Sequence, residues 1–453
     1  MSYSVAQLAA ATPGNRDRYV DLLRVASLGT VVSGHWLMAA VTPDGIGNLL
    51  AVVPGLQVLT WVFQVMPVFF FVGGFSHALS YRSLSRREPG RPVYAAFLRA
   101  RLRRLLRPTL AFVVAWGAAA LAVQLAGGGG GLTGVALRLV TQPLWFIGIY
   151  LAMVAFTPPL LRLHERYGWG AFGALVAAAG AVDVLRFALG VPYVEFLNFA
   201  FVWLAVHQLG FLRADARASG GGWGRVPALL AAAGLGAAAL LVAVGPYPLS
   251  MVGMPGEKVS NMAPPTFALL CHGLWLVGAV ELLRRPATRL LAAPRAWRAV
   301  VAANGVAMTA FLWHLTAMLG VYGAQLALGL DLPRPATAAW WAQVPVRLAA
   351  AALLTALLVA VFRTFERPAP AGPAPAVGSG PLAAGGITLC LLGVLGLSLT
   401  GFGGLLEGHT AVLIAVPVSA PVAVAMVLAG WLLVERAPAP VRTPAPSATR
   451  DAA

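Results

Sequence analysis

Long apolar stretches alternate with short polar segments along almost the whole chain. Each stretch is near or above the roughly 20 residues that an α-helix needs to cross a bilayer. Such lengths with few internal charges are typical of transmembrane helices. The pattern therefore predicts an all-α, polytopic membrane helical bundle. Its twelve expected spans lie at about 19–40, 56–80, 106–125, 143–161, 169–187, 194–212, 226–246, 265–284, 301–328, 341–363, 383–403 and 409–434.

The composition also favours a membrane protein over a soluble one. Hydrophobic residues make up 59% of the chain and charged residues only 10%, whereas soluble domains carry roughly 25% charged residues. The net charge of +17 could indicate a nucleic-acid partner, but the basic residues form short clusters between apolar stretches. Membrane topology requires that distribution. We therefore expect the lipid bilayer as a partner, and no nucleic acid.

The basic residues also predict how the chain is oriented. If the N-terminus is cytoplasmic, 27 of the 32 basic residues lie in cytoplasmic segments and five on the outer side. This is the bias that the positive-inside rule describes. Both termini are thus expected in the cytoplasm. Only one basic residue is a lysine, Lys258, and Ala, Gly and Pro are abundant, a composition that favours a bacterial plasma-membrane protein.

Shifts in composition divide the chain into a core and an appendix. A Pro/Ala/Gly-rich segment at 368–382 is typical of a linker. It separates a ten-span core at 19–367 from a two-span appendix at 383–434. We expect residues 1–18 to form a cytoplasmic segment and 435–453 a disordered cytoplasmic tail. The appendix is expected to be structural, or to contact lipid or a partner.

Two ionisable residues in the first expected span are candidates for function. Charged or titratable groups are costly at membrane depth, and Arg24 and His35 lie eleven positions apart. Eleven helical steps return to nearly the same face, about 16 Å further along the axis. A cavity along this stripe could hold a long phosphate-bearing ligand, with its charged end at Arg24. Alternatively, the arginine snorkels and the histidine bonds to a neighbouring helix.

Several local sequences resemble the acyltransferase-3 family of integral membrane acyltransferases over about residues 15–368. Gly73 stands where that family usually has a serine, so a role for that hydroxyl is absent here. The motifs, in their order along the chain, are RYVDLLRVASLGTVVSGHW with Arg24 and His35, FFFVGGF at 69–75, RARLRRLLRP at 99–108, PLWFIGIYL at 143–151, FLWHLTA at 311–317 and FER at 365–367.

The resemblance implies transfer of an acyl group, often acetyl, from cytoplasmic acyl-CoA to a hydroxyl group. The acceptor would be a sugar, an envelope glycan, a lipid-linked intermediate or a secreted metabolite, including a glycosylated small molecule. His35 would be the catalytic histidine, either as general base or as a transient acyl carrier. Arg24 would contact the CoA phosphates or orient the donor. Acyl-CoA is then a co-substrate, and no permanently bound cofactor or metal is expected.

Other residues are weaker candidates for the same site. The donor-binding set Arg101, Arg103, Arg104 and Arg107 could hold the nucleotide end of CoA, although the positive-inside rule also explains arginines there. His314 could line the cavity or could be a packing histidine. Trp145, Phe146 and Trp313 could wall the acceptor site or anchor the bilayer interface. Glu366 is expected to pair with a nearby arginine. The remaining membrane-depth histidines, His77, His207 and His272, lack a partner signature.

A transporter and a non-catalytic scaffold are the alternatives to an acyltransferase. Twelve spans with both termini inside would also suit a secondary transporter or exporter, but the two halves show no convincing similarity. A non-catalytic scaffold has no use for the Arg24–His35 stripe. The sequence has no P-loop, no GxSxG elbow and no HExxH motif, and its two cysteines and seven histidines show no metal-ligand spacing.

Overall fold

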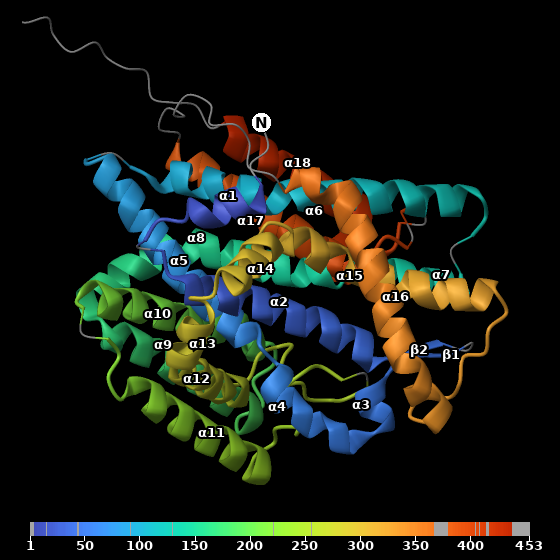
Figure 1. The fold of residues 1–453 in the computed structure, drawn as a ribbon, viewed down its shortest axis with the longest axis horizontal. Helices are drawn as coiled ribbons and strands as arrows, with labels where there is room; N and C mark the ends of the chain where they lie inside the picture. Colours follow the sequence, from blue (N-terminus) through green and yellow to red (C-terminus); the bar gives the residue numbers. More distant parts are fainter. Residues whose placement is uncertain are drawn as a thin grey trace, which may run out of the picture.

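The computed structural model consists almost entirely of helices (Figure 1). It describes residues 4–14, 16–42, 45–90, 92–128, 130–220, 222–254, 256–366, 379–403, 405–406, 408–413 and 416–436. Most of the expected linker and the expected C-terminal tail fall outside this range. The predicted all-α membrane bundle is confirmed.

The core comprises sixteen α-helices, three 3₁₀ helices and one β-hairpin among the described residues. Its α-helices are α1 (Val5–Ala10), α2 (Arg18–Met38), α3 (Leu49–Val52), α4 (Thr60–Phe63), α5 (Met66–Arg87), α6 (Tyr94–Leu125), α7 (Gly131–Leu139), α8 (Pro143–Tyr167), α9 (Trp169–Phe187), α10 (Asn198–Ala218), α11 (Val226–Val244), α12 (Phe267–Leu282), α13 (Arg284–Leu290), α14 (Pro294–Asn304), α15 (Ala307–Ala327) and α16 (Ala338–Phe362). The others are η1 (Pro54–Leu59), η2 (Val194–Leu197), η3 (Arg363–Phe365) and the strands β1 (Ala39–Thr42) and β2 (Gly45–Asn48). The appendix adds α17 (Gly380–Thr400), β3 (Thr410–Leu413), β4 (Val416–Ser419) and α18 (Ala420–Arg436).

Most of the expected spans are helices of membrane-crossing length. Among the described residues, nine helical segments are long and apolar enough to cross a bilayer, or ten if α12 and α13, bent by 49°, count as one span. The expected spans missing from the set of ten are the first and the last. Helix α2 is not in it and carries the polar residues Asp21, Arg24 and His35, and α18 is too short.

Two antiparallel hairpins correct the expected span boundaries. The first span ends at Met38, where β1 begins and pairs with β2. The last span was expected at 409–434, but its first part forms β3 and β4, which pair from Thr410 with Ser419. This part is rich in β-branched residues, which favour extended backbone, and contains Pro417. The helix therefore starts only at Ala420.

Helices α5 and α10 pack closely at two glycines. A Cβ added at Gly74 of α5 would collide with the backbone carbonyl of His207, and one added at Gly210 of α10 would collide with the backbone of Phe71 and Phe75. Small residues allow this kind of close helix approach within membranes. The glycine pair therefore fixes the distance between these two helices, which carry the buried histidines His77 and His207.

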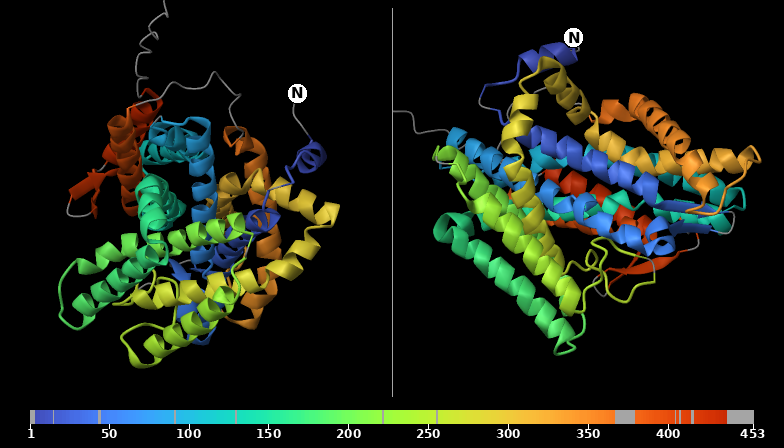
Figure 2. Two further views of the ribbon diagram at one scale, coloured as in Figure 1. Left: turned by 90° about the vertical axis from the view of Figure 1, so that its left-hand side faces the viewer. Right: turned by 60° about the horizontal axis from the view of Figure 1, so that its bottom comes forward.

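The appendix packs directly on the core (Figure 2). Helix α17 lies along α8, where a Cβ at Gly148 would overlap the side chain of Leu395. Near the opposite end of the appendix, Arg103 of α6 forms a two-bonded ion pair with Glu435 of α18, at 2.6 and 2.5 Å. The backbone N–H of Phe402 also donates to the carbonyl of Leu137 at 3.1 Å. The appendix is thus joined to the core at both ends.

A buried carboxylate fixes the start of α2. Asp17 accepts hydrogen bonds from the backbone N–H groups of Tyr19 and Val20 and pairs with Arg217 at 2.7 Å and Arg284 at 2.9 Å. Its side chain is only 6% exposed. Burial alone would raise the pKa of Asp17, but the nearby guanidinium groups of Arg284 and Arg217 lower it overall. Asp17 therefore ties α2 to α10 and α13.

Replacing Asp17 with Asn should destabilise the protein near neutral pH, because two arginines lose their carboxylate while the helix cap is kept. We expect a loss of about 1–2 kcal/mol, since the arginines are partly exposed. A depressed pKa contributes stability that is present above it and lost as pH falls through it. The difference between wild type and Asp17→Asn in thermal unfolding should therefore shrink as pH falls below the ordinary aspartate range. Glu257→Gln, at an exposed loop carboxylate, is the control; an equal difference at acid and neutral pH would contradict this role.

Candidate active site

Two histidines from helices far apart in sequence meet inside the bundle. Nδ1 of His35 on α2 lies 2.7 Å from Nε2 of His314 on α15. Their rings are stacked, with centroids 5.0 Å apart and planes 16° from parallel. His314 is completely buried, whereas His35 is partly exposed. The structure thus brings His35, the catalytic candidate, together with His314, for which a cavity-lining role and a packing role were both open.

The hydrogen bonds of this histidine pair assign its tautomers. Nδ1 of His314 bonds to the backbone carbonyl of Phe311, which can only accept. That nitrogen therefore carries the hydrogen, and Nε2 of neutral His314 accepts from Nδ1 of His35. The remaining nitrogen of His35, Nε2, is left with a lone pair. Because Nδ1 of His35 already carries the hydrogen that it donates to His314, Nε2 is the atom of His35 that can take up a proton.

The helix that carries His314 is held at its N-terminus by Glu366. The carboxylate of Glu366 accepts from the backbone N–H groups of Met308 and Thr309, at 3.0 and 2.8 Å, and from the hydroxyl of Thr309 at 2.6 Å. A carboxylate at a helix N-terminus is stabilised by the helix dipole. Glu366 was expected to pair with an arginine. Among the described residues its partners are instead these groups of α15, because they point directly at the end of η3.

A small pocket that contains several charged side chains lies beside the Arg24 half of α2. It has a volume of about 60 Å³ and is lined by residues of α2, α5, α6, α8, α14 and α15, together with Glu366. Nη2 of Arg24 donates to Oγ of Ser76 at 3.1 Å, and Arg101 donates to the backbone carbonyl of Ser76 at 3.4 Å and to the hydroxyl of Ser80. Arg104 also lines the pocket. The guanidinium groups of Arg24, Arg101 and Arg104 therefore converge on one cavity, which we call the arginine pocket.

The pocket lies at the Arg24 end of the stripe along which a cavity was predicted. Its lining includes Arg24 and Leu28 but not His35. His35 lies seven positions after Leu28, a rise of about 10 Å along a helix. A connection over that distance remains a prediction.

The other two arginines of the expected donor-binding set lie elsewhere. Arg103 is paired with Glu435, and Arg107 lines a separate groove between α6, η3 and α18. Helical spacing explains the division. Arg101 and Arg104 are three positions apart and Arg103 and Arg107 four, so the two pairs occupy different faces of α6.

The three aromatic candidates have separate surroundings. Phe146 is buried with its ring 5.0 Å from that of Phe311, which stacks on His314. Trp313 stacks instead on Phe362 of α16, with centroids 4.1 Å apart. Trp145 is half-buried beside Phe146. Of the three, Phe146 is therefore the one joined to the histidine pair through an aromatic contact.

A second buried histidine pair is connected to the arginine pocket through Tyr150. Nδ1 of His77 is 3.1 Å from Nε2 of His207, and the hydroxyl of Tyr150 is 3.1 Å from Nε2 of His77. Tyr150 also lines the pocket with Arg24, and a Cβ at Gly73 would touch its ring. His272 bonds instead to the backbone carbonyl of Trp61 at 2.9 Å. Tyr150 was missed as a site residue, although it lies within the PLWFIGIYL motif.

Comparison with known families decides what kind of protein contains this site. A family model described as an acyltransferase domain matches residues 17–364. The chain belongs to the acyltransferase-3 family. The resemblance based on local motifs is thereby confirmed, and the protein is a membrane acyltransferase. No curated protein and no solved structure matches the chain.

The matched region of this acyltransferase includes both histidine pairs and the arginine pocket apart from Glu366. It ends two residues before Glu366 and does not include the appendix. The candidate site is therefore built almost wholly from the family domain, with one contact from just beyond its matched end.

Proposed function

We propose that this acyltransferase moves an acyl group from cytoplasmic acyl-CoA to a hydroxyl group, and that the group transferred is acetyl. The acceptor class is a sugar, an envelope glycan, a lipid-linked intermediate or a secreted metabolite, and the site of action is the bacterial plasma membrane. One observation carries the proposal: the hydrogen bonds from Phe311 through His314 to His35 leave Nε2 of His35 as an available base. His35 is the catalytic residue of this proposal.

The arginine pocket supports acyl-CoA as the donor. CoA carries phosphate groups, and guanidinium groups bind phosphate through charge-assisted, often paired, hydrogen bonds. Arg24, Arg101 and Arg104 line a single pocket. It lies at the arginine-rich end of α6, which the positive-inside rule assigns to the cytoplasm, where acyl-CoA is made. The acyl end of the donor would then extend outward along α2 toward His35.

The transfer step needs only the donor, the acceptor and the histidine pair. Nε2 of His35 takes the proton from the acceptor hydroxyl as its oxygen attacks the thioester carbonyl. The tetrahedral intermediate collapses, the ester forms, and the carbon–sulfur bond breaks. The leaving sulfur takes the proton from the imidazolium, which regenerates neutral His35. His314 stabilises the imidazolium through its hydrogen bond. Acyl transfer through an acyl-imidazole on Nε2 is the second route that this geometry allows.

An acyl-transfer assay tests the proposal. Purified protein in liposomes is given acetyl-CoA labelled in the acetyl group, together with an extract of envelope glycans and metabolites. We expect release of free CoA and transfer of the label to an extract component, both dependent on the extract. A secondary transporter would leave the thioester intact. If wild-type protein releases no CoA with any extract fraction, the proposal is wrong.

A donor site at the arginine pocket leads to a specific prediction for the arginines of α6. Arg101→Gln should raise the KM for acetyl-CoA by about 10- to 100-fold, because a charged hydrogen bond is worth about 1.5–3 kcal/mol. Arg103→Gln is the matched control, since Arg103 lies two residues away but pairs with Glu435 outside the pocket. Steady-state kinetics at varied acetyl-CoA measure both. Equal effects of the two substitutions would argue against a donor site at this pocket.

A further inference from the structure

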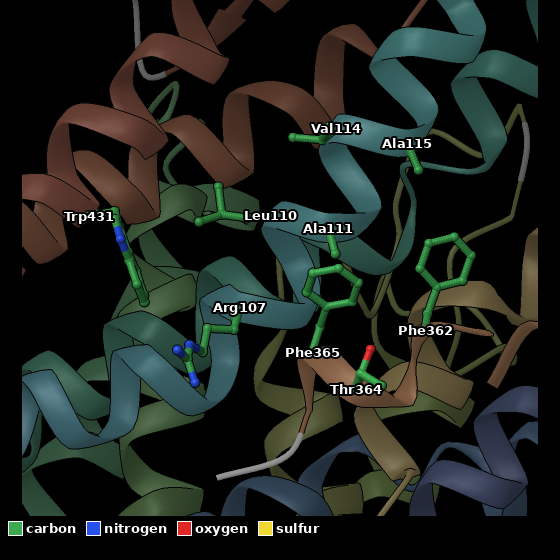
Figure 3. A pocket seen from close by; sticks show the side chains of 9 residues that line it. All are labelled: Arg107, Leu110, Ala111, Val114, Ala115, Phe362, Thr364, Phe365 and Trp431. Atoms are coloured by element: carbon green, nitrogen blue, oxygen red, sulfur yellow. The ribbon is translucent and has the colours of Figure 1, made fainter. Parts of the chain in front are cut away.

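The appendix and the core together enclose a groove outside the candidate active site. The groove has a volume of about 590 Å³ and lies between α6, the end of α16 with η3, and α18. Figure 3 shows its lining, with Arg107 and Trp431 toward one end and Ala115 and Phe362 toward the other. Trp431 is the appendix residue in this lining. The groove therefore exists because α18 packs beside the family domain.

The floor of the groove is one stripe of α6. Its lining residues there are Arg107, Leu110, Ala111, Val114 and Ala115, which follow the three- and four-residue spacing of a single helix face. From the first to the last, the stripe rises about 12 Å. It thus begins with one cation and continues with apolar side chains only. An amphiphile with an anionic head and an apolar chain has the same order of groups.

The cation at the head of this stripe is available to a ligand. Among the described residues, none forms a hydrogen bond or ion pair with Arg107, which is exposed. Arg103, one turn earlier on the same face, is already neutralised by Glu435. Arg107 is also the last basic residue of α6 before the apolar part of the helix. It therefore lies at the boundary between the arginine-rich end and the membrane interior.

We propose that this groove binds one anionic phospholipid of the inner leaflet. The phosphate lies at Arg107, and one acyl chain runs along the apolar stripe between α6, Phe362, Phe365 and Trp431. This orientation matches that of a lipid in the leaflet, with its head at the boundary and its chain toward the midplane. Trp431 has the amphipathic ring that favours this interfacial level. The inner-leaflet assignment rests on the orientation given by the charge bias, and the site is independent of the acyl-transfer reaction.

Lipid titration followed by native mass spectrometry tests the proposal. The full-length protein in detergent is titrated with dioleoyl phosphatidylglycerol or with dioleoyl phosphatidylcholine, and the bound lipids are counted. We expect one phosphatidylglycerol to bind at least about 5-fold more tightly than phosphatidylcholine, the contribution of one arginine near a membrane surface. Arg107→Gln should remove this preference. Arg162→Gln, at another exposed arginine on the same side, should keep it.

A second variant tests the shape of the groove separately from its charge. Ala111→Trp keeps Arg107 but fills the apolar stripe, so it should weaken the binding of both lipids. Circular dichroism and gel filtration check that each variant is folded. Equal affinity of wild type for the two lipids would overturn the proposal, as would the same loss in Arg162→Gln as in Arg107→Gln. Failure of the acyl-transfer assay would leave this lipid result unaffected, so the two proposals can fail separately.

Discussion

Replacing His35 with alanine should abolish CoA release in the acyl-transfer assay. The imidazole is the group whose free nitrogen can accept the hydroxyl proton, and a positioned general base contributes roughly 10²–10⁴-fold to the rate. The substitution should lower kcat and leave the KM for acetyl-CoA nearly unchanged. The reason is that the lining of the arginine pocket includes Arg24 and Leu28 but not His35. Rates of CoA release at saturating acetyl-CoA measure this loss.

The matched control for this substitution is His409→Ala, at an exposed histidine of the appendix beyond the family domain. It should keep wild-type activity. Both variants should show wild-type gel-filtration profiles, so that a loss of rate reports chemistry. Normal turnover by folded His35→Ala protein would refute the assignment of His35 as base and as acyl carrier alike.

Gly74→Ala should destabilise the protein strongly. The added methyl group meets the backbone carbonyl of His207 on the neighbouring helix, and a backbone atom cannot rotate away as a side chain can. Overpacking in a well-packed interior costs about 1–3 kcal/mol and occasionally more. We expect a value at or above the upper end of that range, or failure of the protein to accumulate in the membrane. Thermal unfolding of purified protein measures it.

Two other helical glycines provide the control for this packing effect. A Cβ at Gly173 of α9 or Gly236 of α11 would meet nothing within 4 Å. Alanine at either position should be neutral or stabilising, because alanine favours helix over glycine by about 0.5–1 kcal/mol. If Gly74→Ala unfolds at the same temperature as these controls, the close contact between α5 and α10 does not limit stability.

The helical spans could be predicted because the bilayer imposes one simple length requirement. The start of the last span could not. Residues 409–419 are apolar enough for a membrane helix, and a short apolar run does not distinguish helix from strand by periodicity. In the structure, Thr410–Leu413 and Val416–Ser419 instead pair as the antiparallel strands β3 and β4. Pro417 and the β-branched residues around it were the available signal, and hydropathy alone concealed it.

The candidate site also has features that the sequence could predict and features that it could not. Arg24 and His35 could be identified from sequence because ionisable groups are costly within a membrane. The contact between His35 and His314 could not, since it joins positions 279 residues apart and depends on which face α15 turns toward α2. The split of the arginine cluster was within reach, because helical spacing alone separates Arg101 from Arg103. The partners of Glu366 were not, because they are backbone groups.

The contact of Glu366 with α15 limits where the chain can be cut. The matched family domain ends at residue 364, and a truncation designed at that boundary would delete the carboxylate that caps the helix carrying His314. Expression of the enzyme without its appendix should therefore retain the chain through Glu366. A shorter version would lose the N-terminal anchor of α15, and a loss of activity in it would be attributed wrongly to the missing helices.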